Sequence, residues 1–486
     1  MATTIDTDIC ILGAGSAGLS VAAGAALLGA RTVLIEPGAM GGDCLNTGCV
    51  PSKALLASAK AAVAHRHAGA LGLRAHAPEV DFKAVHDHVH GVIAGIAPQD
   101  SVERFEGMGV TVLRERGRFT GPRELEAGSA RVSARRFVIA TGSAPLVPPI
   151  PGLGGVPYLT NETVFGLSDL PRHLIVIGGG PIGCELGQAF SRLGARVTVL
   201  EQAEILPNDD PELVDILRNR LRADGLELRE GARVTRVEAA GGGAGGAARD
   251  GVAVTVESGG ATERIVERIE GSVLLLAAGR RPVVEELGLA AAGIAHGRAG
   301  IEVDARLRTT NPKVFAAGDV VGGHQFTHMA SHHAVVVIKN ALFRLPAKVE
   351  TRAVPWVTYT DPELAQVGLP EAAARRAHGA IRVLRWPFAD NDRARAERSA
   401  EGLVKVIATP RGRILGASIL GAQAGELIQP WTLAIAQGIK LSAMAATIAP
   451  YPTRGEAGKR AAGGFYADKI SSRWTQGLVR LLLKLG

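Results

Sequence analysis

A unit of strand, glycine loop, helix and strand occurs twice in this sequence, and it restricts the possible folds more than any other feature. The first copy runs from Ile9 to Glu36 and the second from Leu174 to Glu201. Each copy contains an apolar run, a loop with three spaced glycines, a helical pattern and a second apolar run. Strands that alternate with helices in this way predict a parallel sheet of the α/β class.

The two loops have the Gly-x-Gly-x-x-Gly spacing that is typical of dinucleotide-binding sites. The spaced glycines are Gly13, Gly15 and Gly18 in the first copy and Gly178, Gly180 and Gly183 in the second. They permit a tight turn, a close approach of the backbone to a pyrophosphate and close packing of the helix, whose N-terminus then faces the phosphate. Glu36 and Glu201 each follow the first glycine by 23 residues (36 − 13 and 201 − 178), which suits a hydrogen bond to a ribose hydroxyl. Two such units predict two dinucleotides, most economically a held flavin and a diffusible nicotinamide.

Two cysteines, Cys44 and Cys49, lie in the segment GGDCLNTGCVPSK that follows the first unit. Pro51 suits the first turn of a helix, so Cys49 should lie close to a helix N-terminus, where the pKa of a thiol is lowered. Lys53 follows Cys49 by one helical turn and can share its face. The alternatives are a zinc half-site or two inert core thiols, but no further cysteine or nearby histidine completes a ligand set, so we expect no metal site.

Length and composition narrow the class of protein further. A chain of 486 residues is too long for one core and suggests about three domains. The net charge of +7 comes from scattered Lys and Arg residues, so we expect no nucleic-acid partner. Only four cysteines occur, and the N-terminal residues lack the pattern of a signal peptide. We therefore expect a reducing, cytoplasmic location in which a cysteine pair is catalytic.

The cysteine segment resembles the redox motif of class I pyridine nucleotide-disulfide oxidoreductases, the family of dihydrolipoamide dehydrogenase, glutathione reductase and mercuric reductase. Three further segments resemble signatures of that family and occur in the family's order: Ala140–Gly142, Ala278–Pro282 and Val314–Asp319. The resemblance covers nearly the whole chain. It implies a homodimeric enzyme that uses FAD and a nicotinamide cofactor, NAD or NADP, and a redox-active disulfide between Cys44 and Cys49.

The resemblance also implies a domain organisation. The expected fold class is α/β, with two Rossmann-like dinucleotide-binding domains, for FAD and NAD(P), and a C-terminal α+β dimerisation domain. The expected boundaries are 1–149 and 281–350 for the two parts of the FAD domain, 150–280 for the NAD(P) domain, 351–470 for the dimerisation domain and 471–486 for an amphipathic tail.

Individual residues take their expected roles from the same resemblance. FAD binding is implied for Gly13, Gly15, Gly18, Glu36, Thr141 and Asp319, and nicotinamide binding for Gly178, Gly180, Gly183 and Glu201; Gly42, Gly142 and Gly279 complete the cofactor-binding set. Glu185 is implied to pair with Lys53 beside the flavin, where a charge must be compensated, so Lys53 belongs to both the catalytic and the cofactor-binding set. Cys49 would be the sulfur that faces the flavin, and Cys44 would meet the substrate.

The residues after the second acid favour NADH over NADPH. Glu201 is followed by Gln202, Ala203, Glu204 and Ile205, so no Arg or Lys is close in sequence to neutralise a ribose phosphate. The alternative is that Glu201 faces solvent and that a basic residue distant in sequence binds the ribose phosphate of NADPH. Arg233 and Arg281 are the candidates for such a base.

The C-terminal region departs from the family at one catalytic position. The family usually has a His-Pro-Thr-x-x-Glu pattern, whose histidine comes from the other subunit and serves the thiols as acid and base. This chain has Tyr451 at the histidine position and Glu456 at the glutamate position. A histidine with a pKa of about 6.5 can accept a thiol proton, whereas a tyrosine with a pKa of about 10 mainly donates hydrogen bonds. We expect slow dihydrolipoamide turnover; the alternative role for Tyr451 is interface packing alone.

These features favour an enzyme that passes electrons from NADH through FAD to the Cys44–Cys49 disulfide, and on to a small-molecule or protein disulfide or a similar acceptor. The second candidate is a metal-ion reductase, because a tyrosine at position 451 resembles mercuric reductase; that relative, however, also uses a cysteine pair near its C-terminus, and here the last cysteine is Cys184. A quinone reductase of the diaphorase type and a flavin-binding redox sensor that acts by docking remain open.

The last residues form an amphipathic pattern. Apolar residues from Trp474 to Leu485 alternate with Arg473, Arg480 and Lys484 at helical spacing. The stretch is too short to span a membrane. It could make a weak contact with a membrane surface, or it could pack against its own protein.

Overall fold

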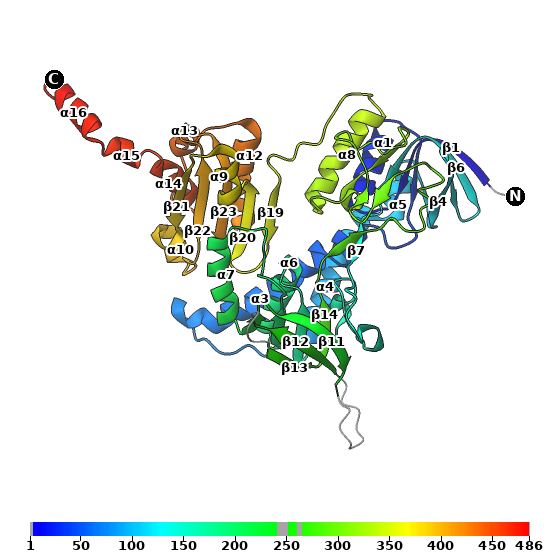
Figure 1. The fold of residues 1–486 in the computed structure, drawn as a ribbon, viewed down its shortest axis with the longest axis horizontal. Coiled ribbons are helices and arrows are strands. Elements are labelled where there is room, and N and C mark those ends of the chain that lie inside the picture. Colours follow the sequence, from blue (N-terminus) through cyan, green and yellow to red (C-terminus); the bar gives the residue numbers. More distant parts are fainter. Residues whose placement is uncertain (1–2, 241–250, 260–264, 486) are drawn as a thin grey trace, which may run out of the picture. The chain divides into compact units, whose positions relative to one another are not determined.

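The computed structural model describes residues 3–240, 251–259 and 265–485. The chain divides into two compact units. The first unit contains residues 1–63, 77–202 and 227–350, and the second contains residues 64–76, 203–226 and 351–486. Each unit is described separately below, and Figure 1 shows the ribbon of the chain.

The first sheet of the first unit is built around the N-terminal strand. Its order is β3 (Val110–Leu113), β2 (Thr32–Ile35), β1 (Thr3–Leu12), β6 (Ala130–Ile139), β5 (Glu124–Ala127) and β4 (Gly117–Gly121), with β18 (Val314–Ala316) also paired to β6. Strands β3, β2, β1, β6 and β18 are parallel, and Ile9 of β1 lies opposite both Thr32 and Arg136. Helices α1 (Ser16–Leu27), α5 (Val102–Gly107) and α8 (Thr327–Ala341) contribute apolar residues to the same core as the strands.

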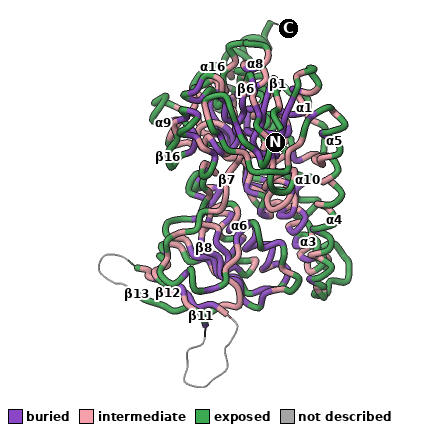
Figure 2. The backbone as a smooth tube through the Cα atoms, turned by 90° about the vertical axis from the view of Figure 1, so that its right-hand side faces the viewer, coloured by how far each residue is buried: buried purple, intermediate pink, exposed green. Residues whose placement is uncertain are grey.

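A second sheet in the same unit contains the strands on both sides of the second glycine loop. Its order is β10 (Leu226–Arg229), β9 (Arg196–Leu200), β8 (His173–Ile177) and β14 (Val273–Leu276), with helix α6 (Pro181–Leu193) after β8. Strand β8 pairs in parallel with β9 and β14. All five residues of β8 are buried, and Figure 2 shows the buried colour along this strand. Residues buried on all sides explain why the strand reads as a continuous apolar run.

Shorter elements complete the first unit. They are α2 (Gly42–Asn46), α3 (Cys49–His67), α4 (Phe82–Ile96), the antiparallel sheet β11 (Arg233–Ala239), β12 (Val252–Ser258) and β13 (Ile265–Gly271), and the pairs β7 (Ser143–Pro145) with β15 (Arg280–Pro282) and β16 (His296–Gly297) with β17 (Gly300–Ile301). The last four residues of α3 belong to the second unit.

The second unit is built on an antiparallel sheet. Its order is β19 (Pro355–Thr358), β20 (Glu363–Gly368), β23 (Ile414–Gly421), β22 (Leu403–Ala408) and β21 (Arg382–Pro387). Its helices are α7 (Pro211–Ala223), α9 (Glu371–His378), α10 (Asp392–Ala396), α11 (Ala424–Leu427), α12 (Gln429–Gln437), α13 (Leu441–Ala446), α14 (Glu456–Gly464), α15 (Ala467–Ile470) and α16 (Arg473–Leu482). The parallel strands around both glycine loops and the antiparallel C-terminal sheet agree with the predicted α/β class. Among the described residues, no helix is long and apolar enough to cross a membrane.

Candidate active site

The first glycine loop is shaped so that side chains would collide with its backbone. Gly13 has φ +101°, and a Cβ atom there would lie 2.3 Å from the carbonyl oxygen of Ala140. A Cβ on Gly18 would lie 1.8 Å from the carbonyl oxygen of Gly13, so α1 packs directly on the loop. Gly15 caps α1 without a side-chain hydrogen bond, which leaves backbone N–H groups of the first turn free for an anion.

The second glycine loop repeats this geometry. Gly178 has φ +112°, and a Cβ atom on it would lie 2.4 Å from the carbonyl oxygen of Ala277. A Cβ on Gly183 would lie 2.0 Å from the carbonyl oxygen of Gly178, while Gly180 has open space and caps α6 without a side-chain bond. Both loops therefore have the narrow backbone and exposed helix N-terminus that fit a dinucleotide pyrophosphate.

The two acids also occupy equivalent positions. Glu36 Oε2 accepts the N–H of Ala14 at 2.7 Å, and Glu201 Oε2 accepts the N–H of Gly179 at 2.7 Å. Each carboxylate thus lies beside the residue that follows the first glycine of its loop, where a ribose next to the pyrophosphate would be within reach. Gly42, with φ +60°, packs against the first loop, since a Cβ atom on it would lie 2.7 Å from the Cα of Gly15.

The remaining predicted cofactor residues gather around β7 and β15. Thr141 Oγ1 donates to the carbonyl oxygen of Val283 at 2.7 Å, and Gly142 and Gly279 both have positive φ. Asp319 Oδ2 accepts a 2.6 Å hydrogen bond from Ser143, while burial raises the pKa of the Asp319 carboxyl group.

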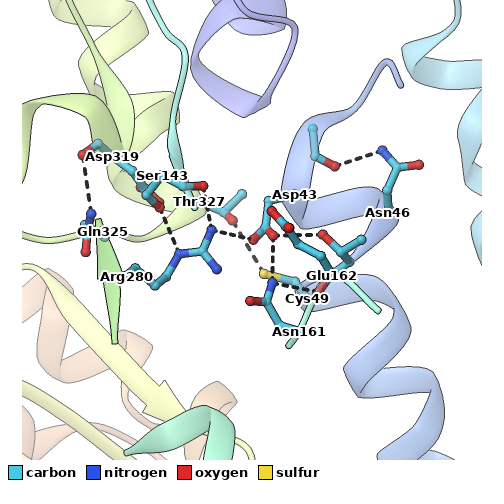
Figure 3. A network of polar contacts seen from close by, with 12 residues as sticks. Asp43, Asn46, Cys49, Ser143, Asn161, Glu162, Arg280, Asp319, Gln325 and Thr327 are labelled. Carbon is cyan, nitrogen blue, oxygen red and sulfur yellow. Dashed lines mark hydrogen bonds and ion pairs between the residues drawn. The ribbon is translucent and has the colours of Figure 1, made fainter. Parts of the chain in front are cut away.

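A polar network connects Asp319 to the cysteine segment, and Figure 3 shows it. Arg280 donates to Ser143 Oγ at 2.8 Å and forms an ion pair with Asp43 at 3.3 Å. Asp43 Oδ1 in turn accepts hydrogen bonds from Thr47 Oγ1 at 2.8 Å and from the Asn161 amide at 2.9 Å. None of these residues had a role predicted from the sequence. Asp43 and Thr47 stand inside the cysteine segment and Arg280 inside the Ala278–Pro282 signature, whereas Ser143 and Asn161 belong to no motif.

The cysteine pair lies at two converging helix N-termini. Cys49 is the first residue of α3, as Pro51 predicted, and Thr327, the first residue of α8, places its Oγ1 3.5 Å from Cys49 Sγ. A hydrogen bond from Cys44 lowers the pKa of the Cys49 thiol to about 6, against the effect of burial, with further lowering from Thr327 and from the Lys53 charge. The same hydrogen bond and burial raise the pKa of Cys44. Cys49 is therefore the thiolate of the pair and Cys44 the thiol.

Lys53 and Glu185 form the ion pair that the family resemblance implied. Lys53 Nζ lies 2.8 Å from Glu185 Oε2, and the Glu185 side chain is 6% exposed. Glu185 belongs to α6, so this contact joins the helix of the second glycine unit to the helix that begins at Cys49. A carboxylate buried to this extent needs such a partner.

Tyr451 and Glu456 belong to the second unit. The Tyr451 side chain is exposed and its hydroxyl donates to Asp392 Oδ2 at 3.3 Å. The charge of Asp392 raises the pKa of the Tyr451 phenol, so this group stays protonated and acts as a donor. Glu456 is the first residue of α14.

The two arginines considered for a ribose phosphate already have carboxylate partners. Arg233 pairs with Glu257 at 2.8 Å, and Arg281 pairs with Glu285 at 2.5 Å. Across the described ranges, no cluster of three or more His, Cys, Asp or Glu residues could hold a metal ion.

Two family profiles match the chain. Residues 7–334 match the family profile of "Pyridine nucleotide-disulphide oxidoreductase", and residues 354–462 match "Pyridine nucleotide-disulphide oxidoreductase, dimerisation domain". Among curated relatives, a dihydrolipoyl dehydrogenase of Thermus scotoductus is 37% identical, covering 95% of this chain and 98% of the relative. A mercuric reductase of Streptomyces lividans is 35% identical, covering 95% and 96%.

Solved structures show the same fold. The HOCl-induced flavoprotein disulfide reductase RclA from Escherichia coli, also solved as a Cu(II) complex, matches with a TM-score of 0.82 at 28% identity, covering 94% of this chain and 99% of RclA. LpdA from Mycobacterium tuberculosis matches with a TM-score of 0.84 at 28% identity, covering 96% and 100%.

Proposed function

The chain belongs to the pyridine nucleotide-disulphide oxidoreductase family, and we propose that it transfers two electrons from NADH to a disulfide acceptor through Cys44 and Cys49. It is an FAD-dependent enzyme that uses NAD(P). The observation that carries the proposal is the placement of the cysteine pair, with Cys49 as the first residue of α3, hydrogen-bonded by Cys44 and 3.5 Å from the Thr327 hydroxyl. The balanced reaction is NADH + H⁺ + RSSR → NAD⁺ + 2 RSH.

The glycine loops are the groups that would hold the cofactors. The first loop, with Glu36, Thr141 and Asp319, would bind FAD, and the second loop, with Glu201, would bind the nicotinamide dinucleotide. Bound together, these cofactors supply two-electron hydride chemistry that protein side chains lack. The Lys53–Glu185 pair would position the Lys53 charge beside that chemistry.

The thiols then complete the exchange. Cys44 attacks one sulfur of the substrate, which forms a mixed disulfide, breaks the substrate S–S bond and releases one thiol. Cys49 attacks the Cys44 sulfur, which re-forms the Cys44–Cys49 bond and releases the second thiol. Before the first attack Cys44 must lose its proton, and its hydrogen bond to Cys49 makes the Cys49 thiolate the nearest acceptor.

Tyr451 would serve this exchange as a hydrogen-bond donor and not as a base. Its raised pKa keeps the phenol protonated at neutral pH. Because the family's histidine is replaced, we propose that acceptors needing strong base catalysis, such as dihydrolipoamide in the reverse direction, turn over slowly.

NADH is the proposed reductant. Glu201 lies beside the second loop, and a carboxylate there accepts hydrogen bonds from a ribose diol but repels a ribose phosphate. The pairing of Arg233 and Arg281 with carboxylates supports this choice.

A serine substitution separates the disulfide pathway from direct transfer to a small oxidant. Cys44→Ser should reduce NADH-dependent turnover of the small disulfide 5,5′-dithiobis(2-nitrobenzoate) by at least about a hundredfold, because the attacking sulfur is gone. Reduction of a quinone such as menadione should persist. Cys10→Ala, which removes a buried thiol outside the site, is the matched control and should keep both rates. Equal disulfide turnover in Cys44→Ser and the wild type would refute the proposed role of Cys44.

A thiophilic metal ion is the second candidate acceptor. Tyr451 supports it, since metal binding to thiolates needs no base of the histidine type, and so do the names of the relatives, a mercuric reductase and a Cu(II) complex of RclA. Steady-state NADH oxidation with Hg²⁺ or Cu²⁺, compared with the disulfide probe in wild type and Tyr451→Phe, decides between the two. If Tyr451→Phe lowers only the rate with the metal ion, metal reduction is favoured as the main activity. If it lowers only the rate with the disulfide, metal reduction is excluded as the main activity.

The dimerisation-domain match supports a homodimer. We further propose that the protein works in a reducing, cytoplasmic compartment, since a reversible pair among only four cysteines suits one. We likewise propose that residues 1–149 and 281–350 bind FAD and that residues 150–280 bind NAD(P). Residues 351–470 would form the dimer, and residues 471–486 would form the tail.

The tail is proposed to rest weakly on membrane surfaces. Helix α16 has no buried residue; Trp474 is 78% exposed, and Leu478 and Leu481 lie on its side of the helix. Arg473 and Arg480 lie one helical repeat apart on another side and suit anionic headgroups. In flotation with vesicles containing phosphatidylglycerol, the full chain should float and a chain lacking residues 471–486 should not. Equal flotation of both would contradict this contact.

A further inference from the structure

A cavity of about 210 Å³ lies in the first unit, near the start of β18 and the end of α8. Its lining contains four arginines, two apolar side chains near the rim, a buried phenylalanine and an asparagine: Arg136, Arg306, Arg308, Arg344, Pro312, Leu345, Phe315 and Asn340. We call these residues the arginine cavity.

The arginine cavity is separate from the proposed cofactor sites. The first glycine loop follows the carboxyl end of β1, whereas Arg136 lies opposite Ile9, three residues before the end of β1 at Leu12. Helix α8 begins at Thr327, beside Cys49, and ends at Ala341, just before Arg344. Since this helix has 15 residues, its two ends are about 22 Å apart. The cavity therefore lies at the far end of α8 from the thiols.

Backbone and side-chain hydrogen bonds hold the arginine-bearing segments in place. Asp304 Oδ1 accepts the backbone N–H groups of Arg306 at 2.9 Å and Arg308 at 3.0 Å, which shapes a tight turn. Asn340 Nδ2 donates to the carbonyl oxygens of Arg306 at 3.1 Å and Ala347 at 2.9 Å, and so ties that turn to the segment after α8. These four bonds use backbone groups of the two segments and do not involve the guanidinium groups.

The cationic side chains of the cavity are short of anionic partners. Arg308 pairs with Asp304 at 2.6 Å, but within the described ranges Arg136, Arg306 and Arg344 form no ion pair. Burial, and then the nearby charge of Arg344, lowers the pKa of Arg136. The charge of Arg136 likewise lowers the pKa of Lys313, the residue before β18. Like charges held together in this way destabilise the free site and favour a bound anion.

We propose that the arginine cavity binds a small anion with a diphosphate group. Guanidinium groups donate paired N–H bonds that match phosphate oxygens, and several arginines around one open cavity suit more than one phosphoryl group. The volume admits a diphosphate but not a whole dinucleotide, for which sites of several hundred Å³ are usual. The rim residues Pro312 and Leu345 would contact a small organic group attached to the diphosphate.

Titration calorimetry with inorganic pyrophosphate tests this site. The FAD-loaded enzyme is first saturated with NAD⁺, so that the second glycine loop is occupied, in about 150 mM NaCl to suppress loose ion binding. We expect one pyrophosphate per chain, and at least about tenfold weaker binding by Arg136→Gln/Arg344→Gln, since two charge-assisted contacts are lost. Flavin content and menadione reduction report that the variant is folded.

The control and the competing ligands decide the outcome. Arg298→Gln/Arg411→Gln removes the same charge from exposed arginines outside the cavity and should bind pyrophosphate like the wild type. Citrate tests multivalent carboxylates, and sulfate tests single anions; both should bind more weakly than pyrophosphate. Equal affinity in the two double variants, equal affinity for sulfate, or no binding by the wild type would overturn the proposal. None of these outcomes depends on which acceptor Cys44 and Cys49 reduce, so the result at the arginine cavity and the proposed function are tested independently.

Discussion

Cys49 is held as a thiolate by groups from three separate parts of the chain. Cys44 donates a hydrogen bond from α2, Lys53 contributes a charge from the next turn of α3, and Thr327 approaches from the start of α8. The N-termini of two helices add favourable potential at the same sulfur. The low pKa is thus a property of the folded unit and not of the cysteine motif alone.

Thr327→Val tests the contribution of the α8 helix at the residue scale. Loss of its hydroxyl should raise the pKa of Cys49 from about 6 by about one unit, since a hydrogen bond to a charged group is lost. The thiolate forms as pH rises through the pKa, so the pH midpoint of iodoacetamide alkylation at Cys49 in the reduced enzyme should move upward. Thr327→Ser keeps the hydroxyl and should keep the wild-type midpoint. An unchanged midpoint in Thr327→Val would remove Thr327 from the account of the thiolate.

At the scale of elements, the two glycine units are near copies in three dimensions. In both, the N–H of the first glycine donates to a carbonyl oxygen at the end of the next strand, Gly13 to Ile35 at 2.8 Å and Gly178 to Leu200 at 2.9 Å. In both, the third glycine packs on the carbonyl of the first within a distance that excludes any side chain. Helices α1 and α6 are therefore set against their strands by the same contact.

Alanine substitution at the third glycine should separate the two dinucleotides. Gly18→Ala should release FAD on purification, whereas Gly183→Ala should keep FAD but weaken NADH binding by at least about tenfold, because each Cβ displaces its own helix N-terminus. Flavin absorbance and the KM for NADH measure the two effects. Gly154→Ala, where a Cβ atom meets open space, is the control. Loss of FAD from Gly183→Ala alone would contradict the assignment of the loops.

For the whole molecule, one buried lysine joins segments that are distant in sequence. Lys405 of β22 is 3% exposed and lies 2.8 Å from Asp210, 2.9 Å from Glu212 and 3.0 Å from Glu371. Helix α7 follows the second glycine repeat in sequence but belongs to the second compact unit. The contacts of Lys405 hold the start of α7 against the sheet of that unit. Arg385 assists by binding Glu212 at 2.7 Å and keeps the pKa of that carboxyl group low, at about 2.

Lys405→Met should therefore destabilise the second unit strongly. It would leave the buried Asp210 carboxylate without its cation, and we expect a loss of about 3–5 kcal/mol in the free energy of unfolding. Urea denaturation of the flavin-loaded dimer measures the change. Lys440→Met, at an exposed lysine, should change stability by less than about 0.5 kcal/mol. A similar small effect in Lys405→Met would show that α7 is held by apolar packing alone.

Local patterns in the sequence determined the repeated units, the position of Cys49 at a helix start and the α/β class. Each depends on neighbours a few residues apart, such as the spacing of Gly13, Gly15 and Gly18, or the distance from Cys49 to Pro51. Such features can be predicted from a few neighbouring residues, because a turn or a helix start restricts only the residues that form it. The Lys53–Glu185 pair, 132 residues apart, was accessible only through the resemblance to a family.

The tertiary structure alone decided which distant side chains complete the site. Thr327 lies 278 residues from Cys49, and Arg280 reaches Asp43 across a similar separation, with no motif that links either pair. Parallel strands bring their carboxyl ends together whatever the length of chain between them, so such contacts depend on topology and not on spacing. The arginine cavity has the same origin, since its cations come from β6, the turn after Asp304 and the segment after α8, and only folding makes them neighbours.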